Sequence, residues 1–230
     1  MLTAAEREAS VASTLTTAAD WKAKGDVRWE LTCVGGAIEA LLTIAVMHHD
    51  SADAGIAYLR GKHVAELLGR YVSLNTTLLQ AFNQGSRAAA VDNTDIFAHI
   101  AWLLDEPALG DSILAIACNP EIAKFWPHTR FWTEYGRAML CLAARAPYEP
   151  KPPPKLKGYE KCWAPYLDLM AALTTAQDTA PALAACAASF TRRNRDKRLT
   201  DWKQHDGDGR LPVRWDFRVP SLLGRWNAGG

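Results

Sequence analysis

The sequence predicts an all-α fold, with about eight to ten helices packed as antiparallel pairs. Alanine, a strong helix former, is the commonest of the 230 residues. Apolar residues recur at offsets of three and four over long segments, which is the spacing of one helix face. No segment alternates apolar and polar residues for long, so no sheet of consequence is expected. We therefore expect a single helical domain over residues 1–230, with an irregular C-terminal tail.

The first half of the chain divides into helices at recognisable start and stop signals. An Ala-rich helix over 3–22 stops near Gly25, and Asp26 can cap the next helix, at 27–48. That second helix is apolar nearly all round its axis, which places it at the centre of the fold. A break follows, where Asp50 or Ser51 can cap the next segment. Apolar spacing then predicts further helices at 62–82, 92–104 and 107–117.

Prolines organise the second half. The run Asn119-Pro120-Glu121 has the capping residue, proline and acid of a helix start, and a helix of about 129–146 follows the interruption at Pro127. Residues 147–157 hold three consecutive prolines, which indicates an extended crossover within one domain. Helices are expected again at about 159–176 and 178–194. The last stretch, 199–230, is left open between a short strand and a helix.

Composition limits the classes of function and of location. The net charge of +1 argues against a whole-protein binder of nucleic acid or membranes. The five cysteines are odd in number and widely spaced, which favours reduced core thiols over a disulfide framework. The N-terminal residues lack the basic and apolar regions of a signal peptide. We expect a cytoplasmic protein.

Catalytic motifs are absent or incomplete. There is no GxSxG, HExxH, GxGxxG or CxxC, so we expect no enzyme activity, catalytic residue, cofactor or bound metal. The most enzyme-like feature is His48-His49-Asp50, which is similar to the His-Asp pair of all-helical metal phosphohydrolases. No histidine precedes His48, so the ligand set is incomplete. A divergent metal-dependent hydrolase using these three residues stays as an alternative.

An acidic window is the best candidate for a binding surface. Residues 88–123 contain no Lys or Arg. Several acids of this window stand at helix ends, where capping alone can explain them. Together they also make a negative surface that can steer and bind a basic protein such as a nuclease. The candidate contact residues are Asp92, Asp95, Asp105, Glu106 and Asp111.

A basic stretch near the C-terminus is the alternative surface. Arg192, Arg193 and Arg195 precede Trp202. Such residues suit a phosphate group or an acidic partner, and tryptophans nearby can stack on bases. They are equally explained by a solvated helix C-terminus, which the helix dipole favours. A regulator that contacts nucleic acid through 192–226 therefore stays as a further alternative.

The C-terminal third carries a resemblance to a known family. The segments are the helix YEKCWAPYLDLMAALTT (159–175), the helix ALAACAASFTRRNRD (182–196) and the polar loop after them. They resemble bacterial immunity proteins of polymorphic toxin systems, particularly the immunity protein 49 family. The resemblance implies an Ala/Leu-rich helical protein of the cytoplasm that binds and neutralises one cognate toxin and performs no catalysis. An immunity protein is therefore the leading hypothesis.

Overall fold

The computed structural model describes residues 3–82, 94–118, 130–150, 160–195 and 214–228, and these ranges are helical without a strand. The predicted all-α class and the number of helices are confirmed. The described helices are α1 (Ala4–Ala23), α2 (Val27–His48), α3 (Ala52–Gly61), α4 (Val64–Phe82), α5 (Thr94–Leu103), α6 (Pro107–Ala117), α8 (Arg130–Ala144), α9 (Ala164–Thr174), α10 (Ala180–Arg195) and α11 (Arg218–Asn227), with a short 3-10 helix, η1 (Glu160–Cys162), before α9.

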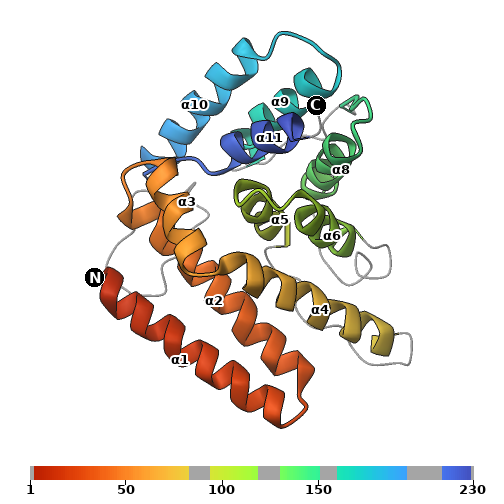
Figure 1. Ribbon diagram of the computed structural model, residues 1–230. Coiled ribbons are helices and arrows are strands. Elements are labelled where there is room, and N and C mark those ends of the chain that lie inside the picture. Colours follow the sequence, from red (N-terminus) through yellow and green to blue (C-terminus); the bar gives the residue numbers. More distant parts are fainter. Residues whose placement is uncertain (1–2, 83–93, 119–129, 151–159, 196–213, 229–230) are drawn as a thin grey trace.

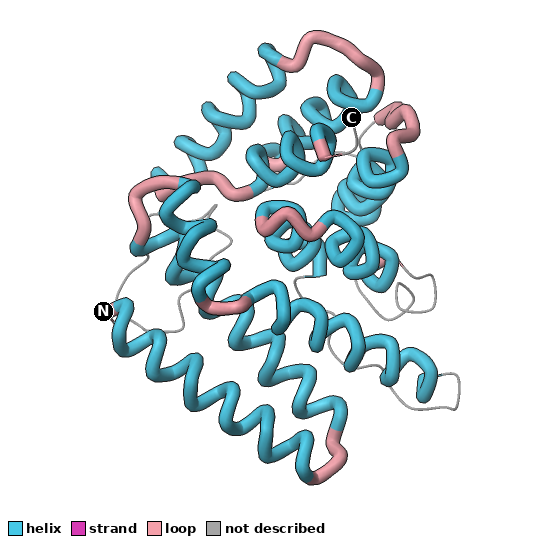
Figure 2. Tube along the Cα trace, in the orientation of Figure 1, coloured by secondary structure: helices cyan, strands magenta, loops and turns pink. Residues whose placement is uncertain are grey.

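Three sets of helices make up the molecule (Figure 1). Helices α1 to α4 form one side and α8 to α10 the other, while α5, α6 and α11 lie between them. The pairs α1/α2, α5/α6 and α9/α10 are antiparallel and joined by short turns, which Figure 2 shows as loops between consecutive helices. The last helix in sequence is thus placed in the middle of the fold.

Helix starts follow the capping residues in the sequence. Thr3 makes a reciprocal capping box with Glu6, Asp26 accepts a hydrogen bond from the Trp29 amide, and Ser51 accepts one from the amide of Ala54. Each side chain satisfies an amide that has no partner within its own helix. The prediction that Asp26 caps helix 27–48 is confirmed.

Four helices end in the same backbone motif. A residue one or two positions after the helix end has positive φ. The amide of the residue that follows it donates to the carbonyl five residues before that amide, which closes the last turn. Glycine is the usual residue at this position because it has no Cβ. Here the positive-φ residues after α1, α5, α8 and α9 are, in order, Gly25, Asp105, Arg145 and Ala176.

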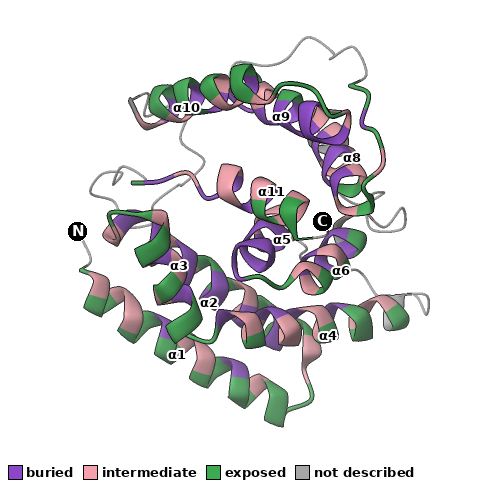
Figure 3. Ribbon diagram, turned by 45° about the horizontal axis from the view of Figure 1, so that its top comes forward, coloured by how far each residue is buried: buried purple, intermediate pink, exposed green. Residues whose placement is uncertain are grey.

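Helix α2 is the centre of its side of the core. Val34, Ile38 and Leu42 are fully buried, and α2 packs against α1, α3 and α4. Figure 3 shows buried residues continuing from α2 through α5 to α9. One connected apolar cluster draws on every described α-helix. Helix 27–48 is therefore buried as expected, but it is central only to the side made of α1 to α4, because α5, α6 and α11 occupy the middle of the fold (Figure 1).

The tail differs from the expectation of irregular structure. Residues 214–217 are extended or bent, but 218–227 form α11, whose Leu222 and Ser221 are fully buried. The reason is that this segment packs against α5, α8 and α9. These tertiary contacts stabilise a helix that the polar sequence pattern does not indicate. The start signal at 119–121, the interruption at Pro127 and residues 151–157 of the crossover lie outside the described residues.

Replacing Leu41 by alanine tests the central role of α2. Leu41 is 3% exposed, so the variant should lose about 2–5 kcal/mol of unfolding free energy through lost burial and a cavity. Urea denaturation measures the loss. Leu140→Ala is the control, because Leu140 is 37% exposed and its removal should cost clearly less. Equal losses in the two variants would contradict this packing.

Candidate functional site

Two of the five predicted acidic residues form an exposed turn between α5 and α6. Asp105 and Glu106 are neighbours in sequence, and both are exposed. Neither carboxylate makes an ion pair within the described part of the chain. We call this pair, Asp105 and Glu106, the acidic turn.

The backbone holds the acidic turn in one conformation. The Glu106 amide donates to the Ala101 carbonyl at 3.0 Å, and Asp105 has φ +67. Proline at 107 starts α6 directly afterwards. At Gly110 a Cβ would lie 2.4 Å from the Trp102 ring, so only glycine lets α5 and α6 approach this closely. The two carboxylates are therefore presented on a rigid support.

Capping does not explain the acidic turn. Glu106 occupies the N-cap of α6, but its side chain makes no capping hydrogen bond. Asp105 follows the C-terminus of α5, where the helix dipole disfavours a negative charge. Aspartate adopts the left-handed conformation more readily than most residues other than glycine, and Glu106 stands at the N-terminus of α6, where the helix dipole favours an acid. No capping hydrogen bond holds the Glu106 side chain, and both carboxylates are exposed.

The other three predicted acids do not belong to this turn. Asp111 bonds to Arg225 of α11 at 2.8 Å and to the indole of Trp102 at 3.1 Å, so it ties α6 to α5 and α11. Asp95 lies in the first turn of α5, where it has contacts within the chain and a favourable place in the helix dipole. Asp92 lies outside the described residues. The acidic surface reduces to Asp105 and Glu106.

The basic stretch is also not one surface. Arg192 is exposed, but Arg193 is only 8% exposed and points into the protein. Its guanidinium lies 3.9 Å from the centre of the Trp163 ring and donates to the Tyr166 hydroxyl at 2.6 Å. The expectation of Arg193 as a surface contact is wrong for this physical reason. The side chain of Arg195 and the whole of Trp202 lie outside the described residues.

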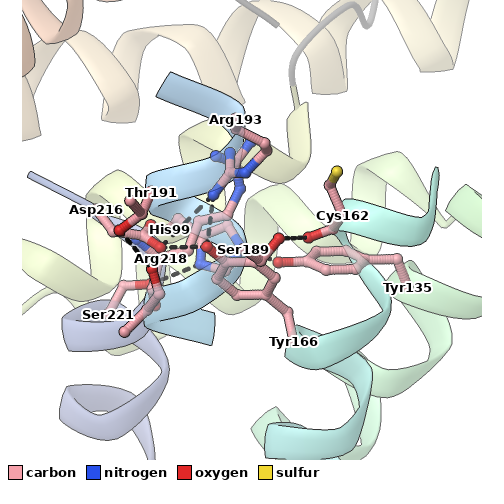
Figure 4. A network of polar contacts seen from close by, with 11 residues as sticks. His99, Tyr135, Cys162, Tyr166, Ser189, Thr191, Arg193, Asp216, Arg218 and Ser221 are labelled. Atoms are coloured by element: carbon pink, nitrogen blue, oxygen red, sulfur yellow. Dashed lines mark hydrogen bonds and ion pairs between the residues drawn. The ribbon is translucent and has the colours of Figure 1, made fainter. Parts of the chain in front are cut away.

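A buried polar network joins the C-terminal segment to α5, α8, α9 and α10 (Figure 4). Asp216 accepts a hydrogen bond from the Tyr166 hydroxyl and lies 3.7 Å from the Arg193 guanidinium. Arg218 lies 4.1 Å from the centre of the same Trp163 ring that contacts Arg193. Burial and the nearby Asp216 carboxylate raise the pKa of Tyr166, so its hydroxyl keeps its proton.

His99 is at the other end of this network and is fully buried. The Ser221 hydroxyl donates to the Arg218 carbonyl at 2.8 Å, so its oxygen accepts from His99 Nδ1 at 2.6 Å. His99 Nε2 then accepts from the Tyr135 hydroxyl at 3.0 Å. Burial, with the Arg218 charge nearby, holds the pKa of His99 well below its ordinary value of 6.5. The ring is a neutral connector of α5, α8 and α11.

His99 and Ser221 are the residue types of a catalytic base and its nucleophile, but neither side chain is accessible from solvent. In hydrolases this pair opens onto a cleft where substrate can reach the hydroxyl. Here both side chains are fully buried, and the serine proton is held by a helix carbonyl. The arrangement connects helices and leaves no position for a reacting atom.

Sequence reasoning did not single out this network. Its members are spread from His99 to Ser221, and each type is common in helices, so no spacing brings them together. One signal was available. Asp216 and Arg218 flank Phe217, and Arg193 follows Phe190 by three residues. Charged and aromatic residues mixed in this way are unusual for a freely solvated tail.

His48, His49 and Asp50 do not converge on one point. The His49 ring lies 4.8 Å from the Tyr58 ring, and Asp50 pairs with Arg214 of the C-terminal segment. Burial, then the nearby charges of Arg7, Arg214 and His49, lowers the pKa of His48. Among the described residues no three His, Cys, Asp or Glu side chains are grouped to hold a metal ion.

No family model, no curated protein and no solved structure matches this chain. Within the described residues, α2 alone is long and apolar enough to cross a membrane by those two measures. Of its most apolar window, 61% is buried inside the protein, against α1, α3 and α4. In this fold the helix is packed in the apolar core of the protein.

His99 makes stability depend on pH. Its folded pKa is depressed, so its contribution is complete above about pH 6.5, the unfolded value, and is lost as pH falls. The loss approaches about 1.4 kcal/mol per pH unit for one proton. Denaturation between neutral and mildly acidic pH measures it. His99→Gln should be less stable at neutral pH and lack this one-proton slope, while substitution of the exposed His63 by glutamine keeps it. An unchanged slope in His99→Gln would contradict the assignment.

The two adjacent histidines should be dispensable except for stability. The purified protein should carry no stoichiometric transition metal, because His49 and Asp50 are turned to Tyr58 and Arg214. Elemental analysis of the protein and of His49→Ala measures this. A stoichiometric metal that is lost in His49→Ala would instead support the hydrolase alternative.

Proposed function

We propose that this chain is an immunity protein, a non-catalytic inhibitor that binds a cognate toxin of the cytoplasm through the acidic turn. The observation that carries the proposal is Asp105 next to Glu106, both exposed on a turn that the backbone holds in one conformation, with neither carboxylate in an ion pair among the described residues. Non-glycine residues with positive φ, such as Asp105, are found more often at functional positions. The resemblance of 159–196 to the immunity protein 49 family supports the same class.

The chemistry of the acidic turn indicates the kind of partner. Two adjacent carboxylates on a rigid support attract a positive surface, and they lose little entropy on binding because the backbone is already fixed. Nucleases present positive clefts because they bind phosphates. A basic nuclease toxin is therefore the partner that fits best, and its cleft is the surface that the turn would contact.

The interior supports an inhibitor rather than an enzyme. His99, Ser221 and Tyr135 make contacts with one another, and Asp111 and Arg225 join α6 to α11. These residue types could serve catalysis elsewhere, but in this protein they are used to fix the helices around the turn. A rigid scaffold that presents a small charged feature is what a competitive protein inhibitor requires.

Reversing the charges of the acidic turn tests the proposal. The partner to use is the product of the reading frame next to the gene for this chain, since a toxin and its immunity protein are inherited together. Asp105→Lys with Glu106→Lys should slow association about tenfold or more, with the largest effect at low salt. Surface plasmon resonance at two salt concentrations measures both rates. Folding should be nearly intact, because exposed charges contribute about 0–1 kcal/mol each.

Two controls separate the effect of charge from the effect of structure. Asp53→Lys with Glu149→Lys makes the same charge change at exposed positions elsewhere and should leave the association rate nearly unchanged. Asp105→Gly should stabilise the protein by up to about 1 kcal/mol while removing one charge. If reversal at the turn leaves affinity unchanged and substitution of Arg192 and Arg195 abolishes it, the acidic-turn proposal is wrong.

A further inference from the structure

The tip of the α1/α2 hairpin carries the most exposed aromatic side chain of the described residues. Trp29 is 51% exposed, at the first turn of α2. Its ring is stacked on Trp21 of α1, with 5.9 Å between ring centres and 24° between planes. Lys24 Nζ lies 4.4 Å from the centre of the Trp21 ring. The indole of Trp29 is thus held in place while half of it faces outward.

Cations surround this indole pair. Lys22, Lys24 and Arg28 are all exposed on the two turns that form the tip. Asp20 and Asp26 are the opposing charges, and Asp26 already caps α2 by accepting from the Trp29 amide. We name the set Trp21, Lys22, Lys24, Arg28 and Trp29 the hairpin tip.

The hairpin tip projects from the rest of the protein. Figures 1 and 3 both place the turn between α1 and α2 at the far edge, away from α5 to α11. The turn passes through Gly25, where a Cβ would meet no atom within 4 Å. A projecting, convex feature of this kind cannot enclose a small ligand, but it can contact a flat surface without hindrance from the described helices α5 to α11 (Figure 1).

We infer that the hairpin tip is a peripheral contact with an anionic lipid surface. Tryptophan favours the boundary between lipid and water, because its ring is apolar and its N–H is polar. Lysine and arginine next to it are attracted to acidic headgroups. The inference goes beyond the proposed function and does not depend on it. The net charge of +1 did not indicate a lipid contact, because it is the sum over surfaces of opposite charge.

A lipid surface fits the tip better than a protein partner does. The exposed large apolar surface of the hairpin tip is one indole, so a protein interface of about 800 Å² on each side would have to extend over the polar outer surfaces of α1 and α2. A membrane requires no minimum area, and contact with it grows with lipid concentration. The binding is reversible, because one inserted aromatic group and a few charges are weaker than a single acyl anchor.

Vesicle flotation tests the inference with the full chain. The two probes are vesicles of phosphatidylcholine alone and vesicles of phosphatidylcholine mixed with phosphatidylglycerol, at low salt. The protein should float with the anionic vesicles only, and added salt should release it. Trp29→Ala should weaken partition about tenfold, with Trp29→Phe intermediate, because the buried apolar area falls in that order. Lys22→Glu, Lys24→Glu and Arg28→Glu together should abolish it.

Matched variants keep the test independent of folding. Leu140→Ala removes the other large apolar side chain that is exposed among the described residues, and this variant should bind vesicles as the unchanged protein does. Circular dichroism should show Trp29→Ala folded, since its indole is half outside the core. No binding to anionic vesicles, or equal binding by Trp29→Ala, overturns the inference. Trp29-dependent binding to polyglutamate or to poly(dT) in place of vesicles also overturns it, in favour of an acidic protein or a nucleic acid.

Discussion

The fold depends on the insertion of its last described segment, residues 214–226, between the two sides of the molecule. The Arg214 amide donates to the carbonyl of Val46, and the Trp215 indole donates to that of Ala45. Both carbonyls belong to the last turn of α2, where no helical amide is left to pair with them. The Trp215 ring fits against Gly55, where a Cβ would lie 2.3 Å away. One short segment thus completes α2 and fixes α3.

The same segment then joins the other side through the buried pair of Asp216 and Arg193, with Tyr166 bonded to the same carboxylate. Further along, Arg225 makes a partly exposed two-bond contact with Asp111 of α6. Burying charges is costly unless they are paired and bonded, so these contacts tolerate few alternatives in position. Apolar packing between helices permits some sliding, but such a network does not. It specifies the arrangement of α5, α9, α10 and α11 in a way that Ala-rich helix surfaces do not.

Most of the helical architecture was predictable, because local signals and packing agree. Helix 27–48 has a cap at Asp26 and an apolar surface all round its axis. In the structure α2 has the same bounds, Val27–His48. Sequence reasoning was less able to find α11, since RVPSLLGRWN is polar on average. Its start signal is Asp216, which accepts a hydrogen bond from the Arg218 amide but stands among aromatic and basic residues. Its helix depends on neighbours that are distant in sequence. The helix ends at Asp105, Arg145 and Ala176 also lack the glycine that usually marks such an end.

The candidate site was predictable in part. The window without Lys or Arg led to Asp105 and Glu106, but the same count included Asp111, whose partner lies 114 residues away. Similarly, the basic stretch grouped Arg192 with Arg193, although one is exposed and the other lies on Trp163. Charge composition reports which side chains are present. It does not report which of them are paired inside, because pairing is decided by long-range packing.

The bond from Trp215 to Ala45 also has a consequence for biosynthesis. It spans 170 residues, so the ribosome releases α2 long before the residues that complete its last turn exist. Until then α2 has an open C-terminus and an uncovered apolar face, a state that chaperones bind and proteases recognise. A chain that stops short of residue 214 lacks this closure permanently. The end of α2 thus becomes protected only after residues 214 and 215 have been synthesised.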